Sequence, residues 1–385
     1  MSYKKGSIFG GALLVAGTAT GGGMLALPVL TAQGGFFPAL LIYLVCCAFM
    51  IATGILLVDV FLWSPKEVNL ISMANMTLGR FGKAAAWVLY LFLFVSLTVA
   101  YLSGGGELLV SLFHLPAWLG PIAFALLFTP VVWVGPWVVD KINVVFMAGL
   151  ILSFLAFVSI GFSHVQPVRL VDHHWPSALF ATPVVFTAFG YQSLVPTLTD
   201  YLGRNRRAVY AAIVAGLAVP LVIYIIWEGL ILGLVSAEDL KAARVMGCTA
   251  VAPLKTALGI SWVYGIGQAF AFFAIVTSFW GVSLAGLDFL ADGLRVKKTG
   301  WNRLGLLLLI IVPPLVFSTA NPCLFLHALH YAGGIGSALL FGFLPIMMIW
   351  IGKRSFPSKI PNWFLLILVL FVVLELGLML VKLIF

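Results

Sequence analysis

The first long apolar segment of this chain is interrupted by the stretch Gly17-Thr18-Ala19-Thr20-Gly21-Gly22-Gly23-Met24-Leu25-Ala26-Leu27-Pro28. Three consecutive glycines are poor helix formers, because glycine loses more conformational freedom than any other residue when it enters a helix. In the middle of a membrane span they also leave backbone polar groups exposed. The stretch therefore predicts a membrane helix that is broken near its centre.

A second break is predicted in the stretch Phe186-Thr187-Ala188-Phe189-Gly190-Tyr191-Gln192-Ser193-Leu194-Val195-Pro196, where glycine, proline and polar side chains replace apolar residues. Irregular backbone at membrane depth is tolerated only where it lines a cavity or is buried in protein. Close helix packing is the alternative explanation for such glycines. We expect it for Gly333-Gly334-Ile335-Gly336, and both explanations stay open for Gly104-Gly105-Gly106.

The composition requires a membrane protein. Of the 385 residues 63% are hydrophobic and 9% charged, whereas soluble domains are about 45–50% apolar and about 25% charged. Disorder needs high charge and few aromatic residues, and membrane strands alternate apolar with polar residues, so neither matches these continuous apolar runs. The net charge of +9 is expected from cytoplasmic loops, since no basic run is interleaved with aromatic residues as a nucleic-acid site requires. The four cysteines are scattered and predict neither disulfides nor a metal site.

The apolar runs predict an all-α polytopic membrane protein with about 11 transmembrane helices in one domain, residues 1–385. Two five-helix blocks, about 7–161 and 176–351, are followed by an extra C-terminal helix, 362–384. Each block begins with a broken helix, and the blocks start on opposite sides of the membrane, which indicates inverted repeats. The expected spans are 7–31, 36–62, 84–112, 117–135, 140–161, 176–202, 207–235, 260–291, 302–319, 323–351 and 362–384.

The basic residues predict the orientation of the chain in the membrane. With the N-terminus in the cytoplasm and the C-terminus outside, most of the 21 lysines and arginines lie on the cytoplasmic side, as the positive-inside rule expects. Those left outside are Arg169, Lys241, Arg244, Lys255 and Lys382.

A broken helix offers free N–H groups where its second half begins and free carbonyls where its first half ends. The N–H end attracts anions and the carbonyl end attracts cations. A zwitterionic α-amino acid satisfies both ends. Paired breaks at corresponding positions of two repeats are the best sequence indication of a transporter's binding site.

These stretches resemble the hydroxy/aromatic amino acid permease family of the amino acid–polyamine–organocation superfamily, and within it the tyrosine-specific transporters. The likeness covers nearly the whole chain. It implies a five-plus-five inverted-repeat (LeuT-like) fold with discontinuous helices 1 and 6. It also implies proton-coupled uptake of tyrosine or a related amino acid across the bacterial cytoplasmic (inner) membrane. The matching residues are 17–28, Gly34-Gly35-Phe36-Phe37-Pro38, 186–196, Thr199-Asp200-Tyr201-Leu202, Arg204-Asn205, Ile223-Tyr224, Trp227, Thr277-Ser278-Phe279 and Asp288-Phe289-Leu290-Ala291-Asp292.

The chain departs from the family pattern at two places. Family members usually have Gly-Thr-Ser-Ile-Gly-Ala-Gly in helix 1, where this chain has Gly-Thr-Ala-Thr-Gly-Gly-Gly. Some relatives also carry a lysine in helix 5 that serves as a fixed cation, whereas this helix is apolar from Val144 to Leu152. A coupling mechanism that depends on that lysine is therefore not expected here.

The two breaks supply the candidate substrate-binding residues. We assign the carboxylate to N–H groups of the glycine triplet and the ammonium to carbonyls near residues 17–18 and 186–189. Aromatic and hydrogen-bonding side chains near the second break, with one tyrosine of helix 3, suit a phenol or an indole. The predicted substrate-binding residues are Gly17, Thr18, Gly21, Gly22, Gly23, Tyr101, Phe186, Thr187, Phe189, Gly190, Tyr191 and Gln192.

Ion coupling requires a group whose charge can change inside the membrane. An intramembrane carboxylate is costly and is a functional candidate by default, so Glu228 is our first choice for a proton carrier and Glu107 our second. Glu228 lies near the predicted outer end of its helix, where water would reach it. A sodium site that includes Thr277 and Ser278 is the alternative, although such hydroxyls often bond their own helix.

Other functional classes lack support. The pair His327 and His330 and the pair His173-His174 have no evident third ligand, so we expect no metal site and no cofactor. An integral membrane enzyme would need a nucleophile–base pair or a metal cluster, and a channel would need a filter motif. A sensor and a sodium-coupled or broader-specificity amino acid transporter stay open. The expected partners are the amino acid, a coupling proton and membrane lipid, and the sequence does not indicate an oligomeric state.

Overall fold

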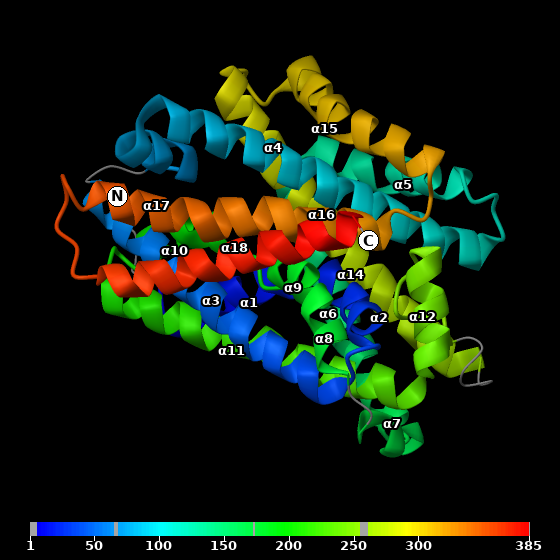
Figure 1. The fold of residues 1–385 in the computed structure, drawn as a ribbon. Coiled ribbons are helices and arrows are strands. Elements are labelled where there is room, and N and C mark those ends of the chain that lie inside the picture. The colour runs from blue at the N-terminus through cyan, green and yellow to red at the C-terminus, as the bar shows by residue number, and fades with distance from the viewer. Residues whose placement is uncertain (1–5, 65–67, 172–173, 255–260, 385) are drawn as a thin grey trace.

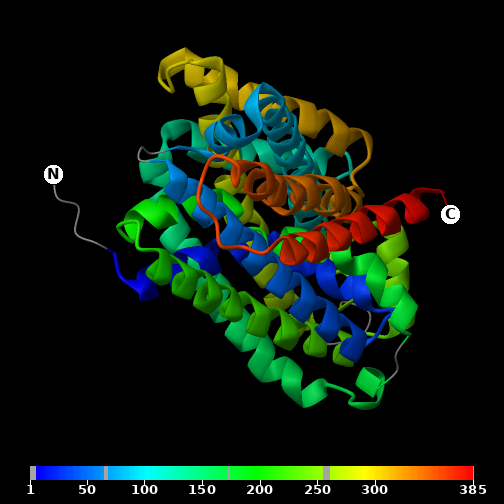
Figure 2. The same ribbon diagram turned by 60° about the vertical axis from the view of Figure 1, so that its left-hand side comes forward.

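The computed structural model describes residues 6–64, 68–171, 174–254 and 261–384, and these residues form helices and no strands. Most of the long helices run in roughly one direction, horizontal in Figure 1, and the start of α1 and the end of α18 lie on opposite sides of the molecule (Figure 2). Of the residues named in the predictions above, His173 and Lys255 lie outside the described residues, as does the side chain of Lys382. Among the basic residues predicted to be cytoplasmic, Lys4, Lys5 and Lys66 also lie outside them.

The first block contains the predicted broken helix and four further helices. The segments are α1 (Ile8–Ala19), the 3-10 turn η1 (Gly22–Ala26), α2 (Leu27–Thr31), α3 (Phe36–Trp63), α4 (Leu70–Phe113), α5 (Leu119–Val134) and α6 (Pro136–Gly161).

The second block is joined to the first by η2 (Phe162–His164) and α7 (Val168–Val171). Its segments are α8 (Trp175–Ala178), η3 (Leu179–Ala181), α9 (Thr182–Ala188), η4 (Gln192–Leu194), α10 (Val195–Tyr201), α11 (Arg206–Leu234), α12 (Ala237–Met246), α14 (Ser261–Leu294), α15 (Gly300–Ala320), α16 (Phe325–Tyr331), the π-helix η5 (Ala332–Phe343) and α17 (Leu344–Gly352), and α18 (Asn362–Ile384) follows.

Both predicted breaks are confirmed. In the first, α1 ends at Ala19, Gly21 is extended, and η1 with α2 leaves at an angle of 43° to α1. In the second, α9 ends at Ala188 and regular helix resumes only at α10, whose second residue is a proline. The early positions of a helix tolerate proline, because their N–H groups have no partner within the helix.

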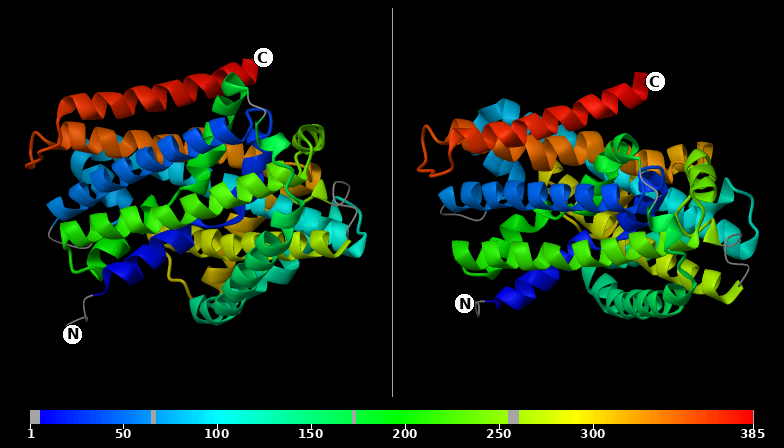
Figure 3. Two further views of the ribbon diagram at one scale, coloured as in Figure 1. Left: turned by 90° about the horizontal axis from the view of Figure 1, so that it is seen from below. Right: turned by 60° about the horizontal axis from the view of Figure 1, so that its bottom comes forward.

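The broken helices lie at the centre of the bundle. The first helix packs on α11, which also packs on α3, and the views in Figure 3 show these three side by side. On the other side of the breaks, α14 packs on α6 and α4. This arrangement places the irregular backbone inside protein, as membrane depth requires.

The helices differ from the predicted spans in three respects. Helix 3 begins at Leu70 rather than at 84 and kinks at Gly79, whose positive φ of 68° suits glycine. Helix 10 is not a plain α-helix, because η5 has π-helical turns. The segment between helices 7 and 8 contains α12, which had no counterpart among the predicted spans.

The predicted number of spans agrees closely with the structure. Among the described residues nine helices are long and apolar enough to cross a membrane, and the bent pair of α1 with η1 and α2 makes a tenth. The remaining predicted span is α5, an apolar helix of 16 residues that is shorter than the others. The packing expected for Gly333 is also confirmed, since a Cβ there would overlap the carbonyl oxygen of Pro183.

Candidate functional site

A cavity of about 490 Å³ lies where the two broken helices meet. Ligand pockets are typically about 300–1,000 Å³, so the volume suits an amino acid with a large side chain. We call it the break cavity. It is lined by nine of the predicted site residues: Gly17, Thr18, Gly21, Gly23, Tyr101, Thr187, Gly190, Thr277 and Ser278.

The break cavity extends toward the side of the membrane on which α1 begins. Its lining includes Leu13 and Leu14 of α1, Tyr90 in the first half of α4, and Ala285 in the second half of α14. All of these residues lie between the breaks and the side of the bundle on which α1 begins. On the opposite side the loop after α12 contacts the first break, where Ala250 donates its N–H to a carbonyl of η1 at 2.9 Å.

The N–H end of the first break is occupied by a side chain. Gly22 donates its N–H to Oγ of Ser278 at 2.8 Å, and that hydroxyl donates to the carbonyl of Ala274 at 2.7 Å. The approach is close, because a Cβ at Gly21 would lie 2.5 Å from the same oxygen. Ser278 thus satisfies the N–H that we predicted for the substrate carboxylate.

The carbonyl ends of both breaks meet at one tyrosine. The Tyr224 hydroxyl lies 2.6 Å from the carbonyl oxygen of Ala19 and 2.8 Å from that of Ala188, and its ring packs on Phe189 with ring centroids 5.1 Å apart. Tyr224 belongs to a stretch that matched the permease family, but the sequence assigned it no role. Its partners are backbone atoms, so no residue pattern could have identified them.

Four predicted side chains point away from the break cavity. Phe186 packs on Phe49, and Phe189 packs on Tyr224. The Tyr191 hydroxyl donates to the carbonyl of Met50 at 3.3 Å, and the Gln192 amide donates to the same carbonyl at 3.3 Å.

All four side chains are fully buried and do not line the break cavity. Gly22 is not among the lining residues either, because it faces Tyr101 and Ile275. The aromatic side chains that do line the break cavity are Tyr90, Phe94, Tyr101 and Phe341.

Glu228 lies one turn beyond Tyr224 on α11 and is 1% exposed, so the expectation that water reaches it does not hold in this structure. Its carboxylate accepts a hydrogen bond from the Tyr43 hydroxyl at 2.6 Å and another from the Thr31 hydroxyl. Thr31 is the last residue of α2. One helix, α11, therefore holds the end of α1 through Tyr224 and the end of α2 through Glu228.

The other two membrane carboxylates lie away from the break cavity. Glu107 on α4 accepts hydrogen bonds from the Thr249 backbone at 3.3 Å and the Thr249 hydroxyl at 3.4 Å, which ties α4 to the loop after α12. Glu375 on α18 is fully buried, and neither of its oxygens has a hydrogen-bond partner among the described residues.

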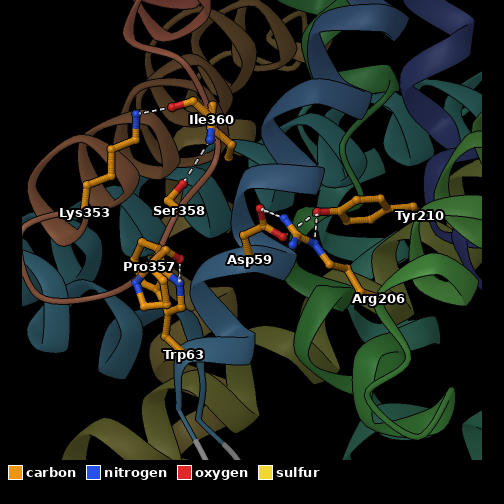
Figure 4. Close-up of polar contacts among 8 residues, drawn as sticks. All are labelled: Asp59, Trp63, Arg206, Tyr210, Lys353, Pro357, Ser358 and Ile360. Carbon is orange, nitrogen blue, oxygen red and sulfur yellow. Dashed lines mark hydrogen bonds and ion pairs between the residues drawn. The ribbon is translucent and has the colours of Figure 1, made fainter.

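The carboxylates at the ends of the spans form ion pairs, as expected for interfacial groups. Asp59 accepts hydrogen bonds from Arg206 and Tyr210, which joins α3 to α11 (Figure 4). Asp200 pairs with Arg204 at 3.3 Å, and Asp288 lies 2.8 Å from Nζ of Lys298. The part of the chain that the structure describes contains no group of three histidine, cysteine or acidic side chains able to hold a metal ion.

Comparison with known proteins identifies related permeases. A model of the tryptophan/tyrosine permease family matches residues 4–383. The chain is 32% identical over 356 residues to the tyrosine-specific transport system 1 of Haemophilus influenzae, covering 90% of this chain and 88% of that protein. It is 28% identical to the tryptophan-specific transport protein of Pseudomonas aeruginosa and 26% identical to the low affinity tryptophan permease of Escherichia coli, with at least 89% of each protein covered.

Solved structures share the fold at low sequence identity. A mutant of the manganese transporter of Eremococcus coleocola superimposes with a TM-score of 0.64 at 12% identity, covering 97% of this chain and 85% of that one. The likeness confirms the predicted five-plus-five architecture with discontinuous helices 1 and 6.

Proposed function

This chain belongs to the tryptophan/tyrosine permease family, and from that premise we propose that it imports tyrosine by proton symport. It is an aromatic amino acid permease of the inner membrane rather than an enzyme, since its relatives are tyrosine- and tryptophan-specific transporters. The preference for tyrosine is favoured by the 32% identity to a tyrosine-specific transport system.

The observation that carries the proposal is the break cavity. Its aromatic lining, Tyr90, Phe94, Tyr101 and Phe341, suits the ring of the substrate. Polar side chains on the same lining, Asn143, Thr187, Ser193 and Ser337, are available to a phenol hydroxyl or an indole N–H. A cavity with apolar walls and a few polar groups is typical of small-molecule sites.

The substrate backbone is proposed to bind at the two breaks. The carboxylate takes the N–H of Gly22 in place of the Ser278 hydroxyl, because the N–H end of a broken helix favours an anion. The ammonium group faces the carbonyls of Gly17 and Thr18, which lie in the last turns of α1 beside the break cavity. The substrate thereby replaces a contact between α14 and the broken helix.

Proton coupling is assigned to Glu228. An ionised carboxylate accepts both hydroxyl hydrogen bonds that Glu228 receives, whereas a protonated one has to give up or reverse one of them. Protonation therefore changes how α11 holds Thr31 at the end of α2, and so links the proton to the second half of the broken helix. Glu107 is the second choice, since its hydrogen bonds to Thr249 are longer and join different elements.

Sodium coupling at Thr277 and Ser278 is the rival, because both residues line the break cavity next to the first break. Both hydroxyls donate to carbonyls of their own helix, at 2.8 Å and 2.7 Å. The Thr277 oxygen keeps its lone pairs for a cation, whereas the Ser278 oxygen already accepts the Gly22 N–H.

The proposed orientation has the N-terminus in the cytoplasm and the C-terminus outside, with inverted repeats at about 7–161 and 176–351. Under this orientation the break cavity opens toward the cytoplasm. Competition uptake in proteoliposomes tests the whole proposal. Unlabelled tyrosine should compete best, and an imposed pH gradient should drive accumulation without sodium. A strict need for sodium, or equal competition by non-aromatic amino acids, contradicts it.

A further inference from the structure

A second cavity, of about 460 Å³, lies between α2, α12, α16 and α18. We call it the distal cavity, because α2 and α18 end beside it, on the side of the bundle away from the start of α1. It shares no lining residue with the break cavity, and between α12 and the first break Ala250 is bonded to η1. The distal cavity has almost the volume of the break cavity, so it admits a molecule of similar size.

The polar lining of the distal cavity is basic. Lys241 and Arg244 come from α12, and His327 and His330 come from α16. No aspartate or glutamate lines it among the described residues. The carboxylates of α12 lie in its first turn, and Asp239 there accepts a hydrogen bond from Ser236.

The positive charge of Arg244 is not balanced by a carboxylate among the described residues. Its Nη1 donates to the neutral amide oxygen of Gln33 at 3.0 Å. Burial lowers the pKa of Arg244, which is the result expected where a cation is partly removed from water without a counter-charge. An anion at this position would supply the missing charge and strong hydrogen bonds.

The remaining walls are apolar and include Leu30, Leu326, Tyr331 and Met379. A ligand that matches this lining has one anionic group and an apolar, ring-sized body. It has no ammonium group, because the cations of α12 would repel one and no carboxylate is present to pair with it. We propose that the distal cavity binds a small aromatic carboxylate that lacks an ammonium group.

The distal cavity thus differs in selectivity from the break cavity, which is matched to a zwitterion. Arg244 is bonded to Gln33, which follows directly after α2. A bound carboxylate accepts the hydrogen bond that Arg244 otherwise donates to Gln33. Binding therefore removes a contact at the end of α2, the second half of the broken helix. Binding itself does not depend on the transport function proposed above, and it is measured without a transport assay.

The test is equilibrium dialysis of labelled indole-3-acetate against the purified full-length protein in detergent. We expect saturable binding that Arg244→Gln weakens about tenfold or more, since hydrogen bonds to charged groups are strong. Lys241→Gln, at an exposed position on the same helix, should weaken it to a smaller extent. The matched control is Arg354→Gln, which removes the same charge from an exposed position in the loop after α17 and should leave binding unchanged.

A second set of binding measurements shows which of the two cavities the probe occupies. Excess tyrosine should not displace indole-3-acetate, and Gly281→Leu, which places a side chain in the break cavity, should retain its binding. An unchanged thermal unfolding midpoint verifies the fold of the Arg244 and Lys241 variants.

The proposal is overturned if no saturable binding is found, or if neither α12 variant weakens it. It is also overturned if tyrosine displaces the probe and Gly281→Leu abolishes its binding, because the probe then occupies the break cavity. Displacement by phosphatidylglycerol that depends on Arg244 would assign the site to a lipid headgroup instead and would equally refute it.

Discussion

Replacing Ser278 by alanine should strengthen substrate binding. The Ser278 hydroxyl accepts the Gly22 N–H at 2.8 Å, at the helix end that we assign to the substrate carboxylate. The two groups therefore compete for one donor. Alanine at this position removes the competitor and leaves the N–H available to the substrate.

The size of the effect follows from the hydrogen bond that the substrate no longer has to displace. The net contribution of such a bond is about 0.5–1.5 kcal/mol, so Kd should fall about two- to tenfold. The bond from the hydroxyl to the carbonyl of Ala274 lies within α14, and its loss is expected to have little effect on Kd. Equilibrium binding of labelled tyrosine to the purified protein measures the change directly.

Thr277→Ala is the matched control. Thr277 also lines the break cavity, but its hydroxyl donates to the carbonyls of Phe273 and Ala274 and makes no contact with the first break. Its removal should leave Kd unchanged. Weaker binding in Ser278→Ala would refute the competition. If both variants bind tyrosine more weakly than the wild type, and only when sodium is present, the result would favour a sodium site at Thr277 and Ser278.

Three further predictions follow from the contacts of the breaks. Tyr224→Phe should lower the thermal unfolding midpoint and weaken tyrosine binding, because it leaves the Ala19 and Ala188 carbonyls without their donor at a cost of about 1–3 kcal/mol; an unchanged midpoint would contradict this. Glu228→Gln should abolish accumulation driven by a pH gradient in proteoliposomes yet preserve tyrosine exchange, whereas full pH-driven accumulation would exclude Glu228 as the carrier. Gln192→Ala should reduce stability without changing the ranking of tyrosine and tryptophan in competition uptake, since its amide bonds α3 outside the break cavity, and a changed ranking would place Gln192 in the pocket.

The architecture was predictable because its signals are local. A glycine triplet inside an apolar run, and a glycine with a proline in the sixth run, identify the two breaks without knowledge of any contact. Their position at the start of each five-helix block then indicates the repeat and the region where a ligand binds. Both breaks occur in the structure at these residues.

The side chains that face the break cavity were less predictable, because a break resets the helical periodicity. Residues 189–191 connect α9 to η4 without regular turns, so the direction of Tyr191 or Gln192 cannot be extrapolated from α9. Both point into α3 instead. The π-helical turns of η5 are likewise absent from the residue pattern, since Gly333 and its neighbours indicate close packing but not the width of the turn.

The sequence contains a signal for the start of α12 but none for the role of Tyr224. The helix α12 has a readable start, because Ser236 is followed three residues later by Asp239, and the serine hydroxyl accepts the Asp239 N–H at 3.1 Å. Tyr224 has no such signal, since it is one of ten tyrosines and bonds only backbone carbonyls.

The central claim, that an aromatic amino acid binds in the break cavity, is tested most directly by tyrosine binding to two variants of one helix. Gly281 and Gly265 both lie on α14, and a Cβ at either meets no atom within 4 Å, but only Gly281 lines the break cavity. Gly281→Leu should abolish saturable tyrosine binding to the purified protein, while Gly265→Leu should bind as the wild type does. Wild-type affinity in Gly281→Leu would contradict the account.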